Sequence, residues 1–131
     1  MANKRQETGE WGEKQAEGHL RRVCGMRVLE RRWRHRHGEL DLILRQGRVL
    51  VFVEVRVRTE AAEPLAMYRS ISRGKWRVLR KTAMAYLRQC QWSPDAVRFD
   101  VVGIRRKPSG ELLDLTHWEN VGVFGRNFRM L

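Results

Sequence analysis

Two acidic residues occupy neighbouring apolar segments of the sequence, at a spacing that would bring their carboxyl groups together. Asp41 lies in segment 39–45, where apolar and polar residues alternate, and Glu54 interrupts the apolar segment 49–58. Alternation predicts a strand, and residues 46–48 between the segments supply a turn, so we expect an antiparallel hairpin. A two-residue turn would set Asp41 directly opposite Glu54.

The same register places Glu39 and Arg56 on the face that carries Asp41 and Glu54, with the leucines of the first strand on the other face. Like charges that face each other across two strands are destabilising unless something compensates them. A divalent cation with oxygen ligands would compensate the pair, and so would Arg56. The alternative is a solvated face whose acids are balanced by arginines. The position of Glu54 favours metal, because a charge within an apolar strand is costly unless it is paired or coordinated.

Helix and strand patterns on both sides of the hairpin indicate the elements that would hold it. Gly25 is expected to end the first helix, and Pro94 follows the second. Residues 59–73 have no sustained period and are expected to form a long loop. The predicted elements are helices at 8–24 and about 72–90, and strands at 26–33, 39–45, 49–58, 97–104 and 111–118. This order predicts an α/β fold with a mixed sheet, in a single domain over 1–131, with residues 1–7 and the last few residues disordered.

The charge of the chain bears on its partners. Lys and Arg number 27 and Asp and Glu number 15 among 131 residues, which gives a formal net charge of +12. Neutralising phosphates releases counterions, so we expect a nucleic-acid partner, with anionic membranes and ribosomes as alternatives. The amino-terminal residues are charged with no apolar run behind them, so no signal peptide is expected. No stretch approaches the roughly 20 apolar residues of a membrane span, and the expected location is cytoplasmic, away from membranes.

Other residues that could do chemistry are expected to be structural. Cys24 and Cys90 are far from any second cysteine or histidine at ligand spacing, so both are interpreted as small core residues rather than zinc ligands. His35 and His37 lie among arginines, which would repel a cation, so they are expected to be solvated. Tryptophans beside apolar residues are expected to pack rather than stack on bases. Asp100, inside an apolar strand, is expected to orient a neighbouring basic side chain.

Together, these motifs resemble those of a nuclease superfamily. An Asp on one strand followed by Glu-x-Lys on the next is the pattern of the PD-(D/E)XK superfamily, which includes restriction endonucleases and archaeal Holliday-junction resolvases. More closely, the chain resembles the YraN family, small bacterial proteins predicted to be endonucleases. The resemblance covers most of the chain and is carried by Gly12-Glu13 with Ala16 and Leu20, by Gly25, Trp33, 38–43, 52–56 with Arg58, 75–87 and 98–101.

The resemblance implies a restriction-endonuclease-like fold with a metal-dependent site. In that fold a helix precedes a three-stranded antiparallel unit, and a second helix and one or two further strands follow. The resemblance implies that Asp41, Glu54 and the backbone carbonyl of Val55 hold Mg²⁺ or Mn²⁺, with Glu13 close to the metal. The metal would lower the pKa of a bound water and orient it for attack on phosphorus. The implied activity is phosphodiester hydrolysis in structured or branched DNA, as in repair or recombination.

Basic residues around the hairpin are the expected nucleic-acid contacts. Phosphate binding is expected of Arg34, Arg36, Arg58, Arg73, Lys75 and Arg77. The alternative for these residues is a solvated charged surface. Glu39 is expected to support the site. DNA is expected in preference to RNA, and a homodimer is possible because resolvases cut two strands symmetrically.

One position departs from the pattern of the family. Members usually carry Lys at the catalytic position of Arg56, where the ammonium positions the nucleophile and stabilises the transition state. Arginine keeps the charge but cannot lose its proton, so Arg56 cannot act as a base. The competing function is therefore a non-catalytic nucleic-acid-binding protein in which Arg56 pairs with Glu39 and Glu54. A third function is a basic assembly protein that binds ribosomal or protein partners.

Overall fold

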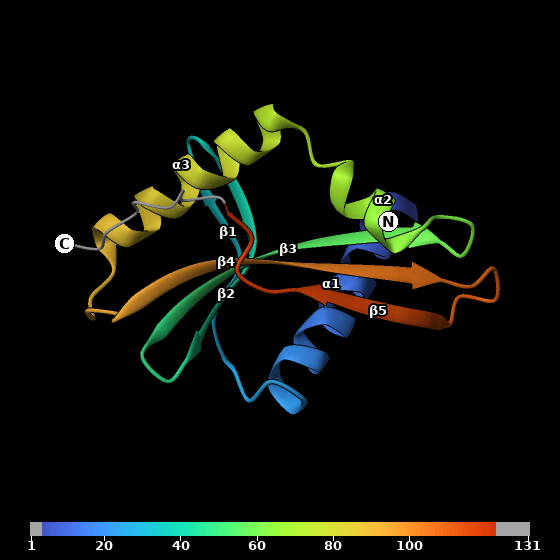
Figure 1. Cartoon of the computed structure of the whole chain (residues 1–131), viewed down its shortest axis with the longest axis horizontal. Helices are drawn as coiled ribbons and strands as arrows, with labels where there is room; N and C mark the ends of the chain where they lie inside the picture. The colour runs from blue at the N-terminus through green and yellow to red at the C-terminus, as the bar shows by residue number, and fades with distance from the viewer. Residues whose placement is uncertain (1–3, 123–131) are drawn as a thin grey trace.

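A five-stranded mixed sheet lies at the centre of the fold, with helices on both of its faces (Figure 1). The computed structural model describes residues 4–122. Its elements are α1 (Lys4–Arg22), β1 (Arg27–His35), β2 (Gly38–Gln46), β3 (Val49–Thr59), α2 (Pro64–Arg69), α3 (Arg73–Gln89), β4 (Ala96–Arg106) and β5 (Leu112–Trp118). The strands lie across the sheet in the same order as in the chain, β1-β2-β3-β4-β5.

The middle of the sheet is the parallel pair β3 and β4, whose register runs from Val49 opposite Ala96 to Thr59 opposite Arg106. Parallel neighbours require a crossover connection, and the residues between these two strands form α2 and α3. The other neighbouring pairs are antiparallel, so β1, β2 and β3 form an antiparallel unit joined by short turns. The mixed α/β sheet predicted from the order of patterns is confirmed.

The segment 59–73 contains the short helix α2, whereas the sequence predicts a loop throughout. Pro64 lies in the first turn of α2, where a helix tolerates proline because the first N–H groups have no partner within the helix. Met67 is buried and anchors the helix to the core. Six residues are too few to reveal a helical period, so the pattern alone could not identify α2.

The amino-terminal helix begins earlier than predicted. Helix α1 starts at Lys4, so the disorder predicted for residues 1–7 is wrong for residues 4–7. Residues 1–3 and 123–131, on which the remaining predictions of disorder fall, lie outside the described residues. Within the described range, none of the helices combines the length and apolar character needed to cross a bilayer.

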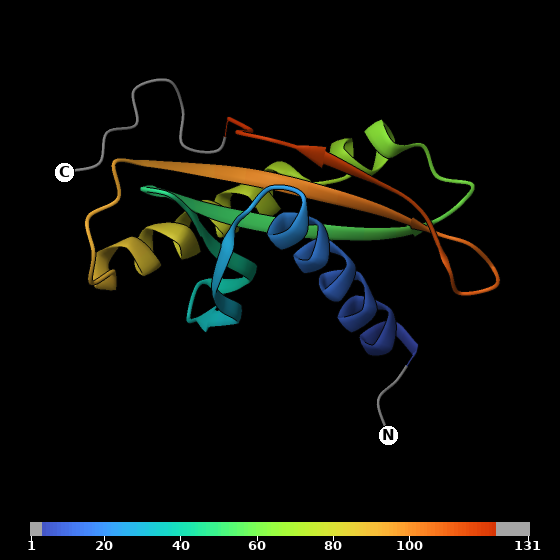
Figure 2. The same cartoon turned by 90° about the horizontal axis from the view of Figure 1, so that it is seen from below.

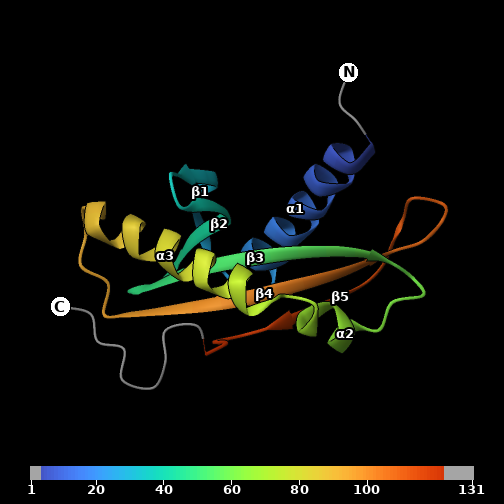
Figure 3. The same cartoon turned by 90° about the horizontal axis from the view of Figure 1, so that it is seen from above.

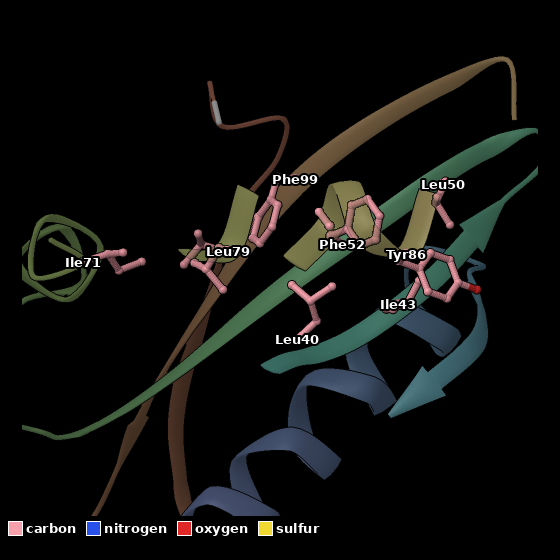
Figure 4. Close-up of a cluster of buried hydrophobic side chains, with 10 residues drawn as sticks. Leu40, Ile43, Leu50, Phe52, Ile71, Leu79, Tyr86 and Phe99 are labelled. Atoms are coloured by element: carbon pink, nitrogen blue, oxygen red, sulfur yellow. The ribbon is translucent and has the colours of Figure 1, made fainter. Parts of the chain in front are cut away.

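Apolar side chains form two clusters, one on each face of the sheet. Helix α1 covers one face (Figure 2), and α3 covers the opposite face (Figure 3). Phe52, Leu79 and Phe99 belong to the cluster beneath α3, as Figure 4 shows. Leu20 and Val51 belong to the cluster beneath α1. Strand β3 therefore contributes core residues to both faces, which explains why its sequence is almost continuously apolar.

Strand β2 does not keep one alternation of faces along its length. Leu42 and Leu44 pack beneath α1 and Ile43 packs beneath α3, as a period of two requires. Leu40 also lies beneath α3, so the prediction that the leucines of this strand share one face is wrong for Leu40. The alternation of faces is interrupted at Asp41. Residues 42–46 of β2 pair with β3, whereas residues 38–41 lie beside β1 alone.

Helix α1 approaches β3 closely at Gly12. A Cβ atom added at Gly12 would lie 2.2 Å from the Cγ2 atom of Val57, well inside van der Waals contact. The next residue of the helix is Glu13, so this contact sets how near α1 can bring that carboxylate to the sheet. Gly9 lies on the same helix, yet a Cβ atom added there would meet no atom within 4 Å.

We expect Gly12→Ala to destabilise the fold. Overpacking a tight contact costs about 1–3 kcal/mol, which exceeds the gain in helix propensity of roughly 0.5–1 kcal/mol. Gly9→Ala should show the propensity gain alone, so it should raise the free energy of unfolding. Chemical denaturation measures both differences. The tight contact is refuted if the two variants are equally stable, and adding Val57→Ala should restore part of the stability that Gly12→Ala loses.

Candidate functional site

The candidate site forms where β2 separates from β3. The ladder between these strands ends at the pair Leu42 and Val53, in the register predicted from the turn. Asp41, the next residue, accepts a hydrogen bond of 2.8 Å from the backbone N–H of Val55. The carboxylate of Asp41 thus satisfies a backbone donor that the ladder no longer satisfies, and this bond holds Asp41 against β3.

Glu54 is the buried partner of Asp41. The side chain of Glu54 is 5% exposed, within the apolar strand β3. Lys75, in the first turn of α3, places its Nζ atom 3.6 Å from the Oε2 atom of Glu54. The Nη2 atom of Arg56 lies 3.8 Å from the same oxygen. Both distances are long for charge-assisted hydrogen bonds, so the two cations offset the charge of Glu54 without binding it closely.

Arg56 is incompletely bonded. Among the residues that the structure describes, the buried Nε atom of Arg56 has no hydrogen-bond partner. A buried donor without an acceptor costs on the order of 1–3 kcal/mol. The predicted pairing of Arg56 with Glu39 is wrong, because Glu39 instead accepts a hydrogen bond of 2.8 Å from the Nε atom of Arg34. The cause is the separation of β2 from β3, which leaves Glu39 opposite β1.

The proximity of the two carboxyl groups changes how Asp41 ionises. Burial raises the pKa of Asp41 well above its ordinary range, and the hydrogen bond and charge of Glu54 raise it further. The N–H group of Val55 and the charge of Lys75 lower the pKa of Asp41 by less. Two carboxyl groups so close do not both ionise readily unless positive charge is added. A divalent cation with oxygen ligands would supply that charge.

Helix α1 and strand β1 add Glu13 and Arg32 to the site. The Nε atom of Arg32 donates a hydrogen bond of 2.7 Å to Glu13. Burial raises the pKa of Glu13, the bond from Arg32 lowers it, and the charges of Asp41 and Glu39 raise it, with a net increase. Glu13 therefore lies within electrostatic reach of Asp41, as the prediction that it approaches the metal requires.

Arg32 also carries backbone strain. Its φ angle is +47°, in the left-handed region that residues other than glycine rarely adopt. Arg32 lies on β1 between the partners of Leu40 and Leu42, which places it opposite Asp41. Such conformations persist only where the surrounding structure requires them. The ion pair of Arg32 with Glu13 could not be predicted from the sequence, because nothing there distinguishes Arg32 from Arg31 and Arg34.

The residues predicted to bind nucleic acid fall into two groups. Those with exposed side chains are Arg34, Arg36, Arg58, Arg73 and Arg77. Lys75 differs, because its side chain is only 41% exposed and lies near Glu54. Helix α3 also presents a row of exposed cations, here called the basic surface of α3, which consists of Arg73, Arg77, Arg80, Lys81 and Arg88.

Several residues interpreted as structural are placed as predicted. The ring of Trp33 packs edge-on against Tyr86, at 5.3 Å between centroids, and so takes part in core packing. Asp100 is fully buried, and both of its carboxylate oxygens accept hydrogen bonds from Arg98. His35 is exposed, as expected for a solvated residue.

The two cysteines are only partly buried, at the margins of the clusters, so the prediction of core positions holds only in part. The Sγ atom of Cys24 lies 3.6 Å from the Nε2 atom of His19 and 3.8 Å from the Nδ1 atom of His117. Sequence reasoning missed this cluster because His117 is 93 residues from Cys24 (117 − 24). The local part of the cluster is His19, five residues before Cys24, but two potential ligands alone do not indicate a metal site.

Comparison with known proteins identifies relatives over most of the chain. The family model described as "Uncharacterised protein family UPF0102" matches residues 12–104. The UPF0102 protein of Frankia alni is 41% identical over 102 residues, which cover 78% of this chain and 83% of that protein. The UPF0102 protein of Pelotomaculum thermopropionicum is 40% identical over 120 residues, which cover 92% of this chain and 98% of that protein. The UPF0102 protein of Mycobacterium tuberculosis is 38% identical over 122 residues, which cover 90% of this chain and 94% of that protein. The names of the family and of these relatives state no activity.

We expect Asp41→Asn to stabilise the protein when divalent cations are removed with a chelator. Asparagine keeps an oxygen for the N–H group of Val55 and removes the repulsion with Glu54, worth on the order of 1 kcal/mol for opposed like charges. The pKa of an aspartate in the unfolded chain is about 3.9, and folding raises the pKa of Asp41 well above its ordinary value. The wild type therefore loses stability as the pH rises from the pKa of the unfolded chain through the pKa of Asp41 in the folded protein. The advantage of the variant should therefore be largest at neutral pH and shrink toward pH 4.

Thermal unfolding at several pH values measures this difference. The matched control is Asp95→Asn, which removes an exposed carboxylate paired with exposed Arg48, and its stability should stay close to that of the wild type. A lower melting temperature for Asp41→Asn than for the wild type at neutral pH would refute the repulsion.

Proposed function

We propose that this chain, which belongs to the uncharacterised protein family UPF0102, is a metal-dependent endonuclease that acts on structured or branched DNA. The observation that carries the proposal is the buried pair of Asp41 and Glu54. We also propose a restriction-endonuclease-like arrangement for the fold. It is supported by an antiparallel unit β1-β2-β3 after α1, with α3 in the crossover to the parallel strand β4.

The residues at the separation of β2 and β3 suit Mg²⁺ or Mn²⁺. Both ions prefer oxygen ligands, and carboxylates of Asp41 and Glu54 supply them. The N–H and C=O groups of one strand residue point to the same side, and the N–H of Val55 points to Asp41. The carbonyl of Val55 therefore points to the same side, beyond the end of the β2–β3 ladder. These three groups are the proposed metal ligands.

A bound divalent cation would supply a water of lowered pKa and offset charge on the leaving oxygen. The side chains of the site have their own roles. Lys75 holds a positive charge 3.6 Å from Glu54, where it can stabilise negative charge that develops on phosphorus-bound oxygens. Arg32 donates a hydrogen bond of 2.7 Å to the carboxylate of Glu13, which fixes the orientation of Glu13 within electrostatic reach of Asp41.

The exposed cations support a nucleic-acid substrate. The net charge is +12, and the basic surface of α3 begins in the same helical turn as Lys75. Cations in a row along one helix suit a phosphate backbone, which fixes position without reading sequence. This mode of binding suits recognition of shape in DNA or RNA, and we propose structured or branched DNA because the hairpin motif resembles that of nucleases that act on such DNA. Cleavage of both strands of such a substrate would be symmetric in a homodimer.

The competing proposal is a non-catalytic nucleic-acid-binding protein on the same fold. The observation that favours it is that Glu54 already lies within 4 Å of two cations, Lys75 and Arg56. A carboxylate balanced in this way needs no metal. Metal binding separates the two functions, because only the endonuclease depends on it.

We expect calorimetry to detect one Mn²⁺ bound by wild-type protein and none bound by Asp41→Ala. Removing one of two carboxylates takes away both a ligand and half of the negative charge that attracts the ion. Asp95→Ala removes an exposed carboxylate elsewhere on the chain and should leave Mn²⁺ binding unchanged. Absence of Mn²⁺ binding by the wild type, with DNA binding intact, would favour the non-catalytic protein.

We expect Arg56→Lys to raise metal-dependent cleavage of branched DNA, by about tenfold or more if the lysine assists proton transfer or charge stabilisation. The shorter side chain removes the unpartnered Nε atom and places a compact ammonium beside Glu54. Single-turnover cleavage by wild type and variant, with and without Mg²⁺, measures the effect.

The idea that arginine limits the rate fails if the wild type cleaves as fast as Arg56→Lys. In that case Lys75→Met tests whether Lys75 supplies the ammonium, because Lys75 already lies near Glu54. Lys107→Met is the matched control, since it removes the same charge from an exposed position just beyond β4, outside the basic surface of α3.

A further inference from the structure

Three side chains from separate parts of the chain converge at the end of α1. His19 lies in the last turn of α1, Cys24 lies just beyond that helix, and His117 lies on β5. The Nε2 atom of His19 lies 3.3 Å from the Nδ1 atom of His117. The Sγ atom of Cys24 lies 3.6 Å from His19 and 3.8 Å from His117. The three potential ligand atoms thus form a nearly equilateral triangle.

The sides of this triangle match the edges of a metal-centred tetrahedron. With Zn–N bonds of about 2.0–2.1 Å and a Zn–S bond of about 2.3 Å, a tetrahedral centre has an N–N edge of about 3.3 Å and N–S edges of about 3.6 Å. The corresponding distances here are 3.3, 3.6 and 3.8 Å. His19 and Cys24 are partly exposed, whereas the side chain of His117 is only 8% exposed, so water would reach a fourth position from the side of His19 and Cys24.

The surroundings of His117 favour its use as a ligand. Its Nε2 atom lies 2.8 Å from the Oδ2 atom of Asp100, which is fully buried. The same carboxylate accepts hydrogen bonds from Arg98 and from the backbone N–H of Asn120, which fix its orientation. An ionised carboxylate at this distance accepts a hydrogen bond from Nε2 of His117, which leaves the lone pair on Nδ1, the atom that lies nearest to His19 and Cys24. Histidine ligands of zinc are commonly held by a carboxylate in this way.

The turn that carries Cys24 is also fixed in place. Gly25 ends α1 with a φ angle of +68°, and the N–H of Met26 bonds to the carbonyl of Leu20 at 2.9 Å. The Nε2 atom of Gln46, on β2, donates a hydrogen bond of 2.7 Å to the carbonyl of Cys24. The thiol therefore needs no rearrangement of the backbone to bind a metal.

We propose that His19, Cys24 and His117 bind Zn²⁺, with water as the fourth ligand. Two imidazoles and a thiolate select zinc over Mg²⁺ and Mn²⁺, which prefer oxygen. The ion would tie the end of α1 to β5, and closing so long a segment of chain stabilises the folded state. The site is separate from the pair of Asp41 and Glu54, because His19 lies six residues beyond Glu13, or about 9 Å along the helix.

Cobalt provides the test, because a thiolate bound to tetrahedral Co²⁺ gives a charge-transfer band in addition to strong visible bands. The reduced, chelator-treated full chain should develop these bands with one equivalent of Co²⁺, and Zn²⁺ should abolish them. Cys24→Ser should lose the charge-transfer band, whereas Cys90→Ser, the matched control, should keep it. Asp41→Asn should also keep the band, which separates this site from an oxygen-ligand site.

Thermal unfolding gives a second readout. Zn²⁺ at a hundredfold excess over its Kd should raise the Tm of the wild type by roughly 5–10 °C, and should not raise the Tm of His19→Gln. Asp100→Asn should weaken Zn²⁺ binding by about 10–100-fold. The zinc site is refuted if the wild type shows no charge-transfer band with Co²⁺, or if the band persists in Cys24→Ser. If Cys24→Ser does not fold, loss or retention of the band in His19→Gln decides.

Discussion

The burial of Glu54 beside Asp41 is the constraint on which the rest of this structure depends. A carboxylate in the interior of a sheet is unfavourable unless charge and hydrogen bonds surround it. Strand β2 leaves β3 at this point, and the oxygen of Asp41 takes over a backbone donor of β3. Lys75 reaches Glu54 only because α3 crosses the face of the sheet that holds Phe52 and Leu40. One local feature thus links β2, β3 and α3.

Other features near the site are unfavourable for stability on their own. Arg32 adopts a backbone conformation that suits glycine, and the Nε atom of Arg56 is buried without a partner among the described residues. Both lie close to the carboxylate pair, on opposite sides of β2. Strain and unsatisfied donors that gather around one cluster of acids are typical of sites selected for binding rather than for stability. Burial of the two apolar clusters on the faces of the sheet offsets the free-energy cost of this strain and of the unpartnered donor.

Local pattern was sufficient to predict the parts of the site that depend on local geometry. Alternation and a short turn determine the register of β2 and β3, so the approach of Asp41 to Glu54 follows from spacing alone. The displacement of Leu40 and the pairing of Glu39 with Arg34 depend on where β2 leaves β3, which no period reveals. Contacts between distant segments, such as that of His117 with Cys24, arise from the assembled sheet.

The parallel pairing of β3 with β4 also implies an order of assembly. Paired residues of these strands are 47 positions apart (96 − 49), whereas Leu42 and Val53 are 11 apart (53 − 42). Hairpins close within microseconds, but pairings between distant segments must first overcome the entropy of closing a long loop. We therefore expect Asp41 and Glu54 to meet while water still surrounds them. Their dehydration then coincides with the late docking of β4 and α3, which brings Lys75 to the pair at the moment when its charge is needed.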